Sequence, residues 1–375
     1  MLVHVKTVIF LVFLHIASSM DVTYINEFRA HQAPLQNVLY IGQHGAAGVV
    51  VLAGRNALYK LSASSLSLEA IHFTGPKNDS LLCPPYPLHC DSQRSVADND
   101  NQVLLPLDSG SNILACGTAY QGICSVHQLA QDLEASQPME KNLRVNYLAS
   151  RRSTAAFFGS GSHSDVLFVA SAYDGRPREY DPHLLSARVF TKPNSFRLRS
   201  FTRNVSDLLK KYHRTRYVHG FSYNDFAYFV TLQNKGASHD TFETRLVRVC
   251  ESDPSFLTYM ELPIRCPKRG GPLSPYRTIA VSASLQHSSK GASHKAGVLA
   301  VAFGTPFKDR WDVSDRRQGS ELCFFDMDAV ETAFHQTVEN CNKGTSKARL
   351  SLFFHDKSDL KCVRIVSVLV DVTIK

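Results

Sequence analysis

The sequence predicts an all-β protein whose short antiparallel strands repeat as the blades of a β-propeller do. Apolar runs alternate with tight turns, and helical signals are few. A turn, a strand, a second turn and a closing strand recur after about 65 residues, a period that suggests propeller blades. A large β-sandwich is the alternative, but its strands would not repeat at this length. The predicted closing strands fall near Tyr59, Cys124, Val247 and Phe324.

Three hairpins are predicted where two apolar runs flank a short polar turn. Gly, Asn, Asp and Ser occupy the turns, and these residues tolerate the backbone angles that tight hairpins require. The hairpins join residues 49–52 to 57–61, 102–105 to 113–116, and 216–221 to 226–231.

Four further apolar or alternating runs predict single strands. They are residues 165–170, 244–249, 297–303 and 321–325. Residues 328–335 predict one short helix, and residues 205–212 predict a weaker one.

The composition is that of an ordinary globular protein. Of 375 residues, 44% are hydrophobic and 20% are charged, which argues against a disordered, collagen-like or coiled-coil protein. The formal net charge of +8 favours acidic partners without identifying one.

The first residues predict a signal peptide over residues 1–19. Lys6 precedes an apolar run of about ten residues, and small residues follow at Ala17 and Ser19. This run is too short to span a membrane, and the last apolar stretch is interrupted by Arg364 and Asp371. We therefore expect a protein of the secretory pathway. That route disfavours nucleic acid as a partner and leaves sulfated glycans or acidic proteins.

Two Asn-x-Ser motifs agree with this route. Asn78 and Asn204 are the predicted glycosylation sites, which would mark solvent-facing surface.

The nine cysteines contain no Cys-x-x-Cys pair, so zinc-ribbon and thioredoxin interpretations lose their usual support. Short segments separate Cys83 from Cys90 and Cys116 from Cys124, which suits local disulfides in an oxidising compartment. An odd count leaves at least one cysteine without an intramolecular partner.

No motif predicts catalysis. The nucleophile elbow, the HExxH zinc motif and the P-loop are all absent from the sequence. The Gly/Ser-rich residues 159–164 are typical of a plain turn. Five scattered histidines lack the spacing of a metal site: His44, His72, His89, His127 and His163. We expect no enzyme, no catalytic residue, no metal and no cofactor.

Seven basic residues lie between positions 197 and 216, with Asp207 as the only acid among them. Such a stretch can bind heparan sulfate, and the alternative is a solvated loop and helix face. The candidate heparin-binding residues are Lys210, Lys211, Arg214 and Arg216.

Several motifs in order resemble the sema domain of plexins. NDNQVLL (99–105) precedes LACGTAYQGIC (114–124), in which Gln121-Gly122 is the plexin form of a segment that semaphorins share only in part. The resemblance continues through FSYNDFAYFVTL (221–232), TRLVRVC (244–250) and YMELPIRC (259–266). It extends from about Val22 to Cys362.

The resemblance implies a sema-type seven-bladed β-propeller, of which this chain would supply roughly the first five blades. The sema domain would occupy residues 20–362, and the tail 363–375 does not resemble the family. The resemblance also implies the disulfides Cys83–Cys90, Cys116–Cys124, Cys266–Cys323 and Cys341–Cys362. Cys250 would be unpaired here and would pair further downstream in a complete plexin.

The function implied is that of the extracellular head of a plexin-like receptor, which recognises the sema domain of a semaphorin in cell and axon guidance. The chain would be held at the plasma membrane only through a missing C-terminal span. The alternative is a secreted decoy or a glycosaminoglycan-binding fragment without signalling. The resemblance places the ligand surface within residues 151–234, where Arg176, Arg178 and Tyr180 are the candidate contacts.

Overall fold

A computed structural model describes the chain over twelve ranges. They are residues 27–30, 34–43, 46–85, 89–141, 143–191, 195–201, 214–234, 242–266, 279–288, 296–307, 310–314 and 319–343. The predicted signal peptide, the weaker helix 205–212 and the tail 363–375 lie outside the described residues.

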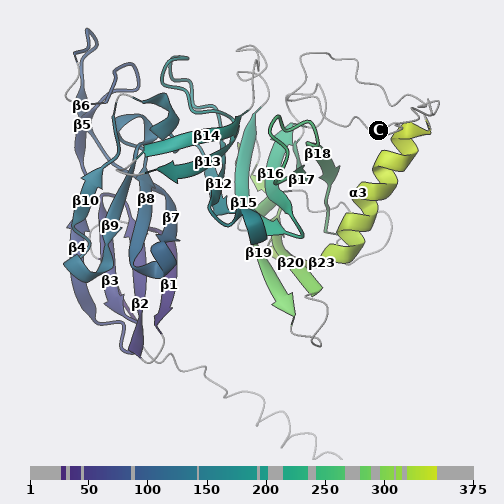
Figure 1. The fold of residues 1–375 in the computed structure, drawn as a ribbon, viewed down its shortest axis with the longest axis horizontal. Helices are drawn as coiled ribbons and strands as arrows, with labels where there is room; N and C mark the ends of the chain where they lie inside the picture. Colours follow the sequence, from purple (N-terminus) through teal and green to yellow (C-terminus); the bar gives the residue numbers. More distant parts are fainter. Residues whose placement is uncertain are drawn as a thin grey trace, which may run out of the picture.

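Five antiparallel sheets follow one another along the chain as five propeller blades (Figure 1). Blade 1 contains β1 Leu35–Gln43, β2 Ala46–Gly54, β3 Ala57–Ser62 and β4 Leu68–Phe73. Blade 2 contains β7 Asn101–Leu107, β8 Asn112–Gly117, β9 Cys124–Gln128 and β10 Ala135–Pro138. Blade 3 contains β11 Thr154–Phe158, β12 Val166–Ser171, β13 Leu185–Thr191 and β14 Ser195–Phe201.

Blade 4 contains β15 Thr215–Tyr223, β16 Phe226–Asn234, β17 Phe242–Cys250 and β18 Met260–Pro263. Blade 5 contains β19 Ile279–Ser288, β20 Ala296–Gly304 and β23 Ser320–Asp326, and α3 Met327–Asn342 follows it. Two small ribbons pair β5 Lys77–Asp79 with β6 Ser95–Ala97 and β21 Pro306–Phe307 with β22 Arg310–Ser314. Short 3-10 turns occur at Asp108–Gly110, Tyr120–Gly122, Leu129–Gln131, Arg144–Asn146 and Gly161–His163.

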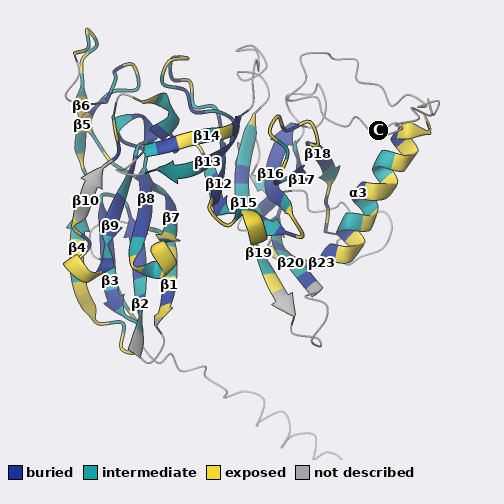
Figure 2. Ribbon diagram, in the orientation of Figure 1, coloured by how far each residue is buried: buried dark blue, intermediate teal, exposed yellow. Residues whose placement is uncertain are grey.

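Neighbouring blades pack face to face through shared apolar clusters. At the contact of blades 3 and 4, the Phe157 ring lies 5.8 Å from Phe168 and 5.2 Å from Phe229. All six residues of β12 are buried, as the apolar run at 165–170 predicts, and Figure 2 shows the buried residues concentrated in the inner strands. Burial on both faces explains why this strand is continuously apolar rather than alternating.

The three predicted hairpins are confirmed. The turn between β15 and β16 places Asn224 and Asp225 at φ 46° and 61°, and Asn56 between β2 and β3 has φ 65°. These residue types tolerate the left-handed region, which matches the twist of the paired strands.

The predicted repeat is also confirmed, since every predicted closing strand is the third strand of a blade. The third strands begin at Ala57, Cys124, Leu185, Phe242 and Ser320. The strand beginning at Leu185 accounts for the long interval between the predicted positions at Cys124 and Val247.

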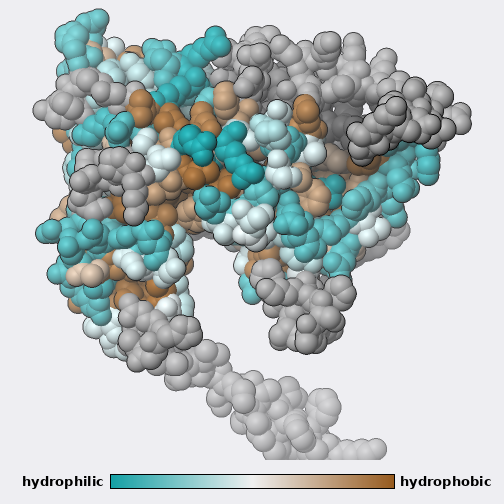
Figure 3. Space-filling view, in the orientation of Figure 1, coloured by the Kyte–Doolittle hydropathy of each residue, from teal (hydrophilic) through white to brown (hydrophobic). Residues whose placement is uncertain are grey.

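Helix α3 begins at the predicted place but continues to Asn342, well beyond residue 335. The Asp326 side chain caps it by accepting hydrogen bonds from the backbone N–H groups of Asp328 and Ala329, at 2.8 and 3.3 Å. Phe334 on its buried face meets Tyr228 of blade 4 at 6.1 Å between ring centres. The opposite face is polar and exposed (Figures 2 and 3). The helix therefore ties blade 5 to blade 4.

The first and fifth blades each keep one face free of any described blade. On blade 1, Val38 and Tyr40 are 70% and 65% exposed. On blade 5, Leu322 and Phe324 are 58% and 66% exposed. Elsewhere in the structure, large apolar side chains of this kind fill the contacts between neighbouring blades.

Candidate ligand-binding surface

The candidate loop at residues 175–180 lies between β12 and β13 of blade 3. The Pro177 carbonyl accepts hydrogen bonds from the N–H groups of Tyr180 and Asp181, both at 2.9 Å. The Asp181 carbonyl in turn accepts two bonds from the Arg144 guanidinium, at 2.9 and 2.8 Å. The loop is thus fixed at its C-terminal end by a neighbouring segment.

Arg176 is a structural residue, so its prediction as a ligand contact is wrong. Its side chain is fully buried and pairs with Asp174 at 2.5 Å. It also donates to the carbonyls of Gln121 and Ala149, at 2.7 and 3.0 Å. The guanidinium makes four hydrogen bonds within the protein, and its burial keeps it from reaching a partner at the surface. Arg side chains are common at interfaces, but the sequence does not show which of two nearby arginines points inward.

Arg178 is exposed and Tyr180 is half-buried, so both remain candidate contacts. The Tyr180 ring meets Tyr147 edge to face, with 6.5 Å between centres. Burial, together with the neighbouring Tyr180, raises the pKa of Tyr147 to about 12. The pair is therefore uncharged at neutral pH, and Arg178 carries the only positive charge that the candidate residues expose.

Asp174 is the anion that holds this corner together. Burial opposes its ionisation, but the hydrogen bonds and charge of Arg176 outweigh burial, so the pKa of Asp174 lies below its usual value. The Arg151 backbone N–H adds a bond to the same carboxylate at 2.9 Å. The Arg151 side chain reaches Asp79 of β5 at 3.4 Å. A chain of charged contacts therefore connects the 79–83 segment with blade 3.

Gln121-Gly122, which served above only as a family marker, organises the same corner. The buried Gln121 amide donates to the carbonyls of Ser80, Leu81 and Cys83, the last at 2.5 Å. Gly122 has φ 80°, and a Cβ atom there would lie 2.1 Å from the Ala149 carbonyl oxygen. Only glycine fits both the backbone angle and the close approach.

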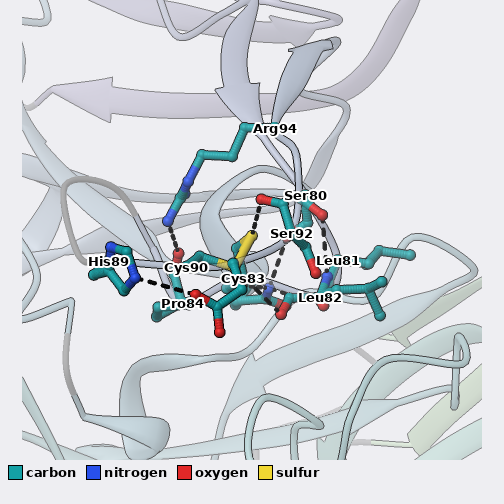
Figure 4. Close-up of a disulfide and its surroundings, with 11 residues drawn as sticks. Ser80, Leu81, Leu82, Cys83, Pro84, His89, Cys90, Ser92 and Arg94 are labelled. Carbon is teal, nitrogen blue, oxygen red and sulfur yellow. Dashed lines mark hydrogen bonds and ion pairs between the residues drawn. A yellow bond between two sulfur atoms is a disulfide. The ribbon is translucent and has the colours of Figure 1, made fainter.

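The Cys83–Cys90 disulfide closes the loop that Gln121 holds (Figure 4). The Cys83 N–H donates to the Ser80 carbonyl at 3.2 Å. Across the loop, Arg94 donates to the Pro84 carbonyl at 2.8 Å, as the close-up shows.

Three of the four disulfides implied by the resemblance form in the structure: Cys83–Cys90, Cys116–Cys124 and Cys266–Cys323. Cys341 is also disulfide-bonded, and Cys362 lies outside the described residues. Cys250 is half-buried and has a free thiol, whose sulfur lies 3.1 Å from the Ser252 hydroxyl oxygen.

Of the candidate heparin-binding residues, Arg214 is exposed and Arg216 is half-buried on β15. Lys210 and Lys211 lie outside the described residues. Arg197 and Arg199 of the same basic stretch are exposed on β14. The described part of the stretch therefore presents arginines from blades 3 and 4 to solvent.

Asn78, one of the two predicted glycosylation sites, is exposed on β5. Asn204 lies outside the described residues.

One group of potential metal ligands occurs among the described residues: His163, Asp225 and Glu251 have ligand atoms within 4.8 Å of one another. The buried Glu251 carboxylate already accepts hydrogen bonds from Ser160, from its N–H at 3.1 Å and its hydroxyl at 3.4 Å, and from the Ser222 hydroxyl. These donors join the 159–164 turn of blade 3 to blade 4. The group is explained as an inter-blade contact, and the 159–164 turn is structural.

No protein-family model matches the chain. Individual relatives do. Human Plexin-A4 is 29% identical over 367 residues, a match that covers 89% of this chain and 18% of that protein. A solved structure of the full extracellular region of Plexin A4 superposes with a TM-score of 0.72 at 26% identity, and the match covers 89% of this chain and 38% of that one. A chain of the solved complex of Drosophila Plexin A with Semaphorin 1b has a TM-score of 0.50 at 16% identity, over 80% of this chain and 54% of that one.

The five blades and these likenesses define the class of protein: a sema-type β-propeller, present here in part. Within that class the chain is a homologue of the plexins, with the Cys116–Cys124 and Gln121-Gly122 features in place.

The chain spans less than a fifth of the length of the curated plexins it matches. Within the described ranges, no helix combines the length and the apolar character that crossing a membrane requires.

Proposed function

We propose that this chain forms part of the extracellular head of a plexin-like receptor and binds the sema domain of a semaphorin. The observation that carries the proposal is the likeness to Plexin A4 in sequence and fold over nearly nine-tenths of the chain. The solved complex of a Drosophila plexin with a semaphorin supports the choice of partner.

The loop at residues 175–180 is the proposed contact. It is held from within by Arg176, so Arg178 and Tyr180 are presented from a rigid support. A rigid loop binds with a smaller loss of conformational entropy than a mobile one. Arg and Tyr are also the residue types that contribute most at protein interfaces.

The test is surface plasmon resonance between the full chain and a panel of immobilised semaphorin ectodomains. We expect saturable binding to at least one of them. Arg178→Glu and Tyr180→Ala should each weaken it at least about tenfold if they are central contacts. Arg199→Glu, which makes the same charge change on β14 of the same blade, is the matched control. Absence of binding across the panel would refute the proposal, and unchanged binding by both loop variants would remove this loop from it.

We also propose the domain limits stated above: a signal peptide over residues 1–19, a sema domain over 20–362 and a divergent tail over 363–375. They imply passage through the secretory pathway to the extracellular face of the plasma membrane. Intact-mass analysis of the secreted chain tests the first of these limits, because cleavage after Ser19 sets the mass of the deglycosylated product.

Heparan sulfate binding by Lys210, Lys211, Arg214 and Arg216 stays a prediction, as does the secreted-decoy alternative. Heparin-column retention of the Arg214→Glu variant tests the heparin prediction, because Arg214 is the exposed arginine among the described candidates. The secreted-decoy alternative requires that the isolated secreted chain capture a semaphorin, which a pull-down can measure.

A further inference from the structure

A cleft of about 220 Å³ lies between blades 1 and 2, outside the surface described above. One wall is formed by the end of β4 and the residues after it, and the other by β8, β9 and the turn between them. This volume is far larger than the space that one buried water needs, so the cleft has room for a small molecule. The side chains that matter are His72, Phe73, Lys77, Tyr120, Ser125 and Lys141.

The cleft is positively charged. Lys77 and Lys141 line it, and none of its described lining residues is acidic. Neither lysine forms an ion pair with any residue the structure describes, and Lys141 lies over the Tyr120 ring at 5.3 Å. Burial and the charge of Lys77 lower the pKa of His72, against the opposing effect of Glu134. The positive charge of the cleft therefore comes from the two lysines, which suits an anionic group.

The floor of the cleft supplies a hydrogen-bond acceptor. The Leu133 carbonyl lies 2.8 Å from His127 Nδ1, which fixes the proton on that nitrogen. His127 Nε2 then accepts a hydrogen bond from the Ser125 hydroxyl, with 2.6 Å between the two atoms. The lone pairs of Ser125 Oγ remain available to a ligand hydroxyl. Burial lowers the pKa of His127 to about 4, so the pair is neutral and adds no charge of its own.

An aromatic ring also lines the cleft, beside the two lysines and the Ser125 acceptor. Phe73 lines the cleft and is 64% exposed, which leaves its apolar surface open to a ligand. Cations, a hydroxyl acceptor and an apolar face together suit a molecule that carries an anionic group, hydroxyl groups and C–H bonds. An inorganic ion would use only the first of these.

We propose that this cleft binds one acidic sugar unit, a monosaccharide bearing a sulfate or carboxylate group. Lys77 and Lys141 hold the anion, Ser125 accepts a sugar hydroxyl, and Phe73 packs against the ring. The site is separate from the semaphorin contact proposed above, and either proposal can fail without the other.

Saturation-transfer NMR on the full secreted chain tests the site, because it detects weak sugar binding. The probes are N-acetylglucosamine 6-sulfate and glucuronate, with N-acetylglucosamine as the neutral comparison. We expect saturable binding of an acidic sugar and none of the neutral one. Lys77→Gln and Lys141→Gln should each lower the affinity about tenfold or more, the effect of losing a charged hydrogen bond.

Lys343→Gln is the matched control, since it removes the same charge from the exposed end of α3, where Lys343 pairs with Glu339 at 3.7 Å. Thermal unfolding shows whether each variant is folded, and Ser125→Ala gives a second, uncharged test. Failure of both acidic sugars to bind, equal binding of the neutral sugar, or full affinity in both lysine variants would overturn the proposal. Sulfate ion that binds as tightly as the sulfated sugar would overturn it too.

Discussion

The Arg176 guanidinium donates a 2.7 Å hydrogen bond to the carbonyl oxygen of Gln121, a residue that lies 55 positions earlier and belongs to the preceding blade. Through this bond the candidate loop of blade 3 rests on the segment that holds the Cys83–Cys90 loop. Three separate parts of the chain therefore share one buried corner.

Replacing Arg176 should destabilise the protein strongly. Arg176→Met leaves the buried carboxylate of Asp174 without its cation, and removal of one partner of a buried pair typically costs about 3–5 kcal/mol. Chemical denaturation measures the change. Arg178→Met, two residues along on the exposed side, should shift the free energy of unfolding by less than about 0.5 kcal/mol. Similar effects of the two variants would contradict the structural role given to Arg176.

Two glycines with positive φ should respond differently to alanine. Gly122→Ala meets both backbone strain and the Ala149 carbonyl, so we expect a cost of about 3 kcal/mol or more. Gly175→Ala has φ 92° but nothing within 4 Å of the new Cβ, so strain alone should cost about 1–2 kcal/mol. Melting temperatures of the two purified variants show which substitution costs more. A Gly122→Ala protein that is more stable than Gly175→Ala would refute the close approach of Gly122 to Ala149.

The disulfides should differ in their contribution to stability. Cys266–Cys323 joins residues 57 apart and ties the end of blade 4 to the third strand of blade 5, whereas Cys116–Cys124 spans 8 residues. The chain-entropy relation gives roughly 4 kcal/mol for the long loop and roughly 2.5 kcal/mol for the short one. Denaturation of the two double-alanine variants compares them. A larger loss from the short loop would show that local packing outweighs chain entropy.

Acid should destabilise the folded protein, because His127, which lies where blades 1 and 2 meet, resists protonation in the folded state. Burial, and to a smaller degree the charge of His72, lower the pKa of His127 from 6.5 to about 4, although its hydrogen bond to Leu133 opposes the shift. Between these values the unfolded chain binds a proton that the folded chain does not, so stability falls as pH falls from 6.5 towards 4. The loss between pH 7 and pH 5 should be about 2 kcal/mol.

His127→Gln should make the free energy of unfolding less sensitive to pH over this range, because it removes the titrating group. Denaturation at pH 7 and pH 5 measures the slope, and an NMR titration assigns the pKa. A His127 pKa close to 6.5 in the folded chain would contradict the expectation.

The strands and the repeat were predictable because both depend on local pattern. Alternating apolar residues and Asn or Asp turns specify a hairpin such as β15–β16 within about twenty residues of sequence. The β13 strand of blade 3 was missed because its four buried residues, from Leu185 to Arg188, include Ser186 and an arginine. The Arg188 side chain is buried because it donates to the Tyr147 carbonyl and the Ser186 hydroxyl, and no local pattern reveals such partners.

The corner built around Gln121 and Arg176 was not predictable in the same way. Its contacts join residues from blade 2, blade 3 and the β5 segment, and they exist only once the blades are packed. The sequence singled out the 175–180 loop as rich in Arg and Tyr. It could not separate Arg176, which Asp174 draws into the interior, from the exposed Arg178. The nearby Asp174 was the available signal, since a carboxylate two residues from an arginine can pair with it locally.

The Cys266–Cys323 bond also determines how the chain responds to a protease. Every peptide bond between these two cysteines lies inside a covalent ring, and that ring includes β19 and β20. One cut within it changes neither the mass of the chain, apart from one added water, nor the number of pieces in solution. A single cleavage there would be invisible on a non-reducing gel and would appear as two fragments only after the disulfide is reduced.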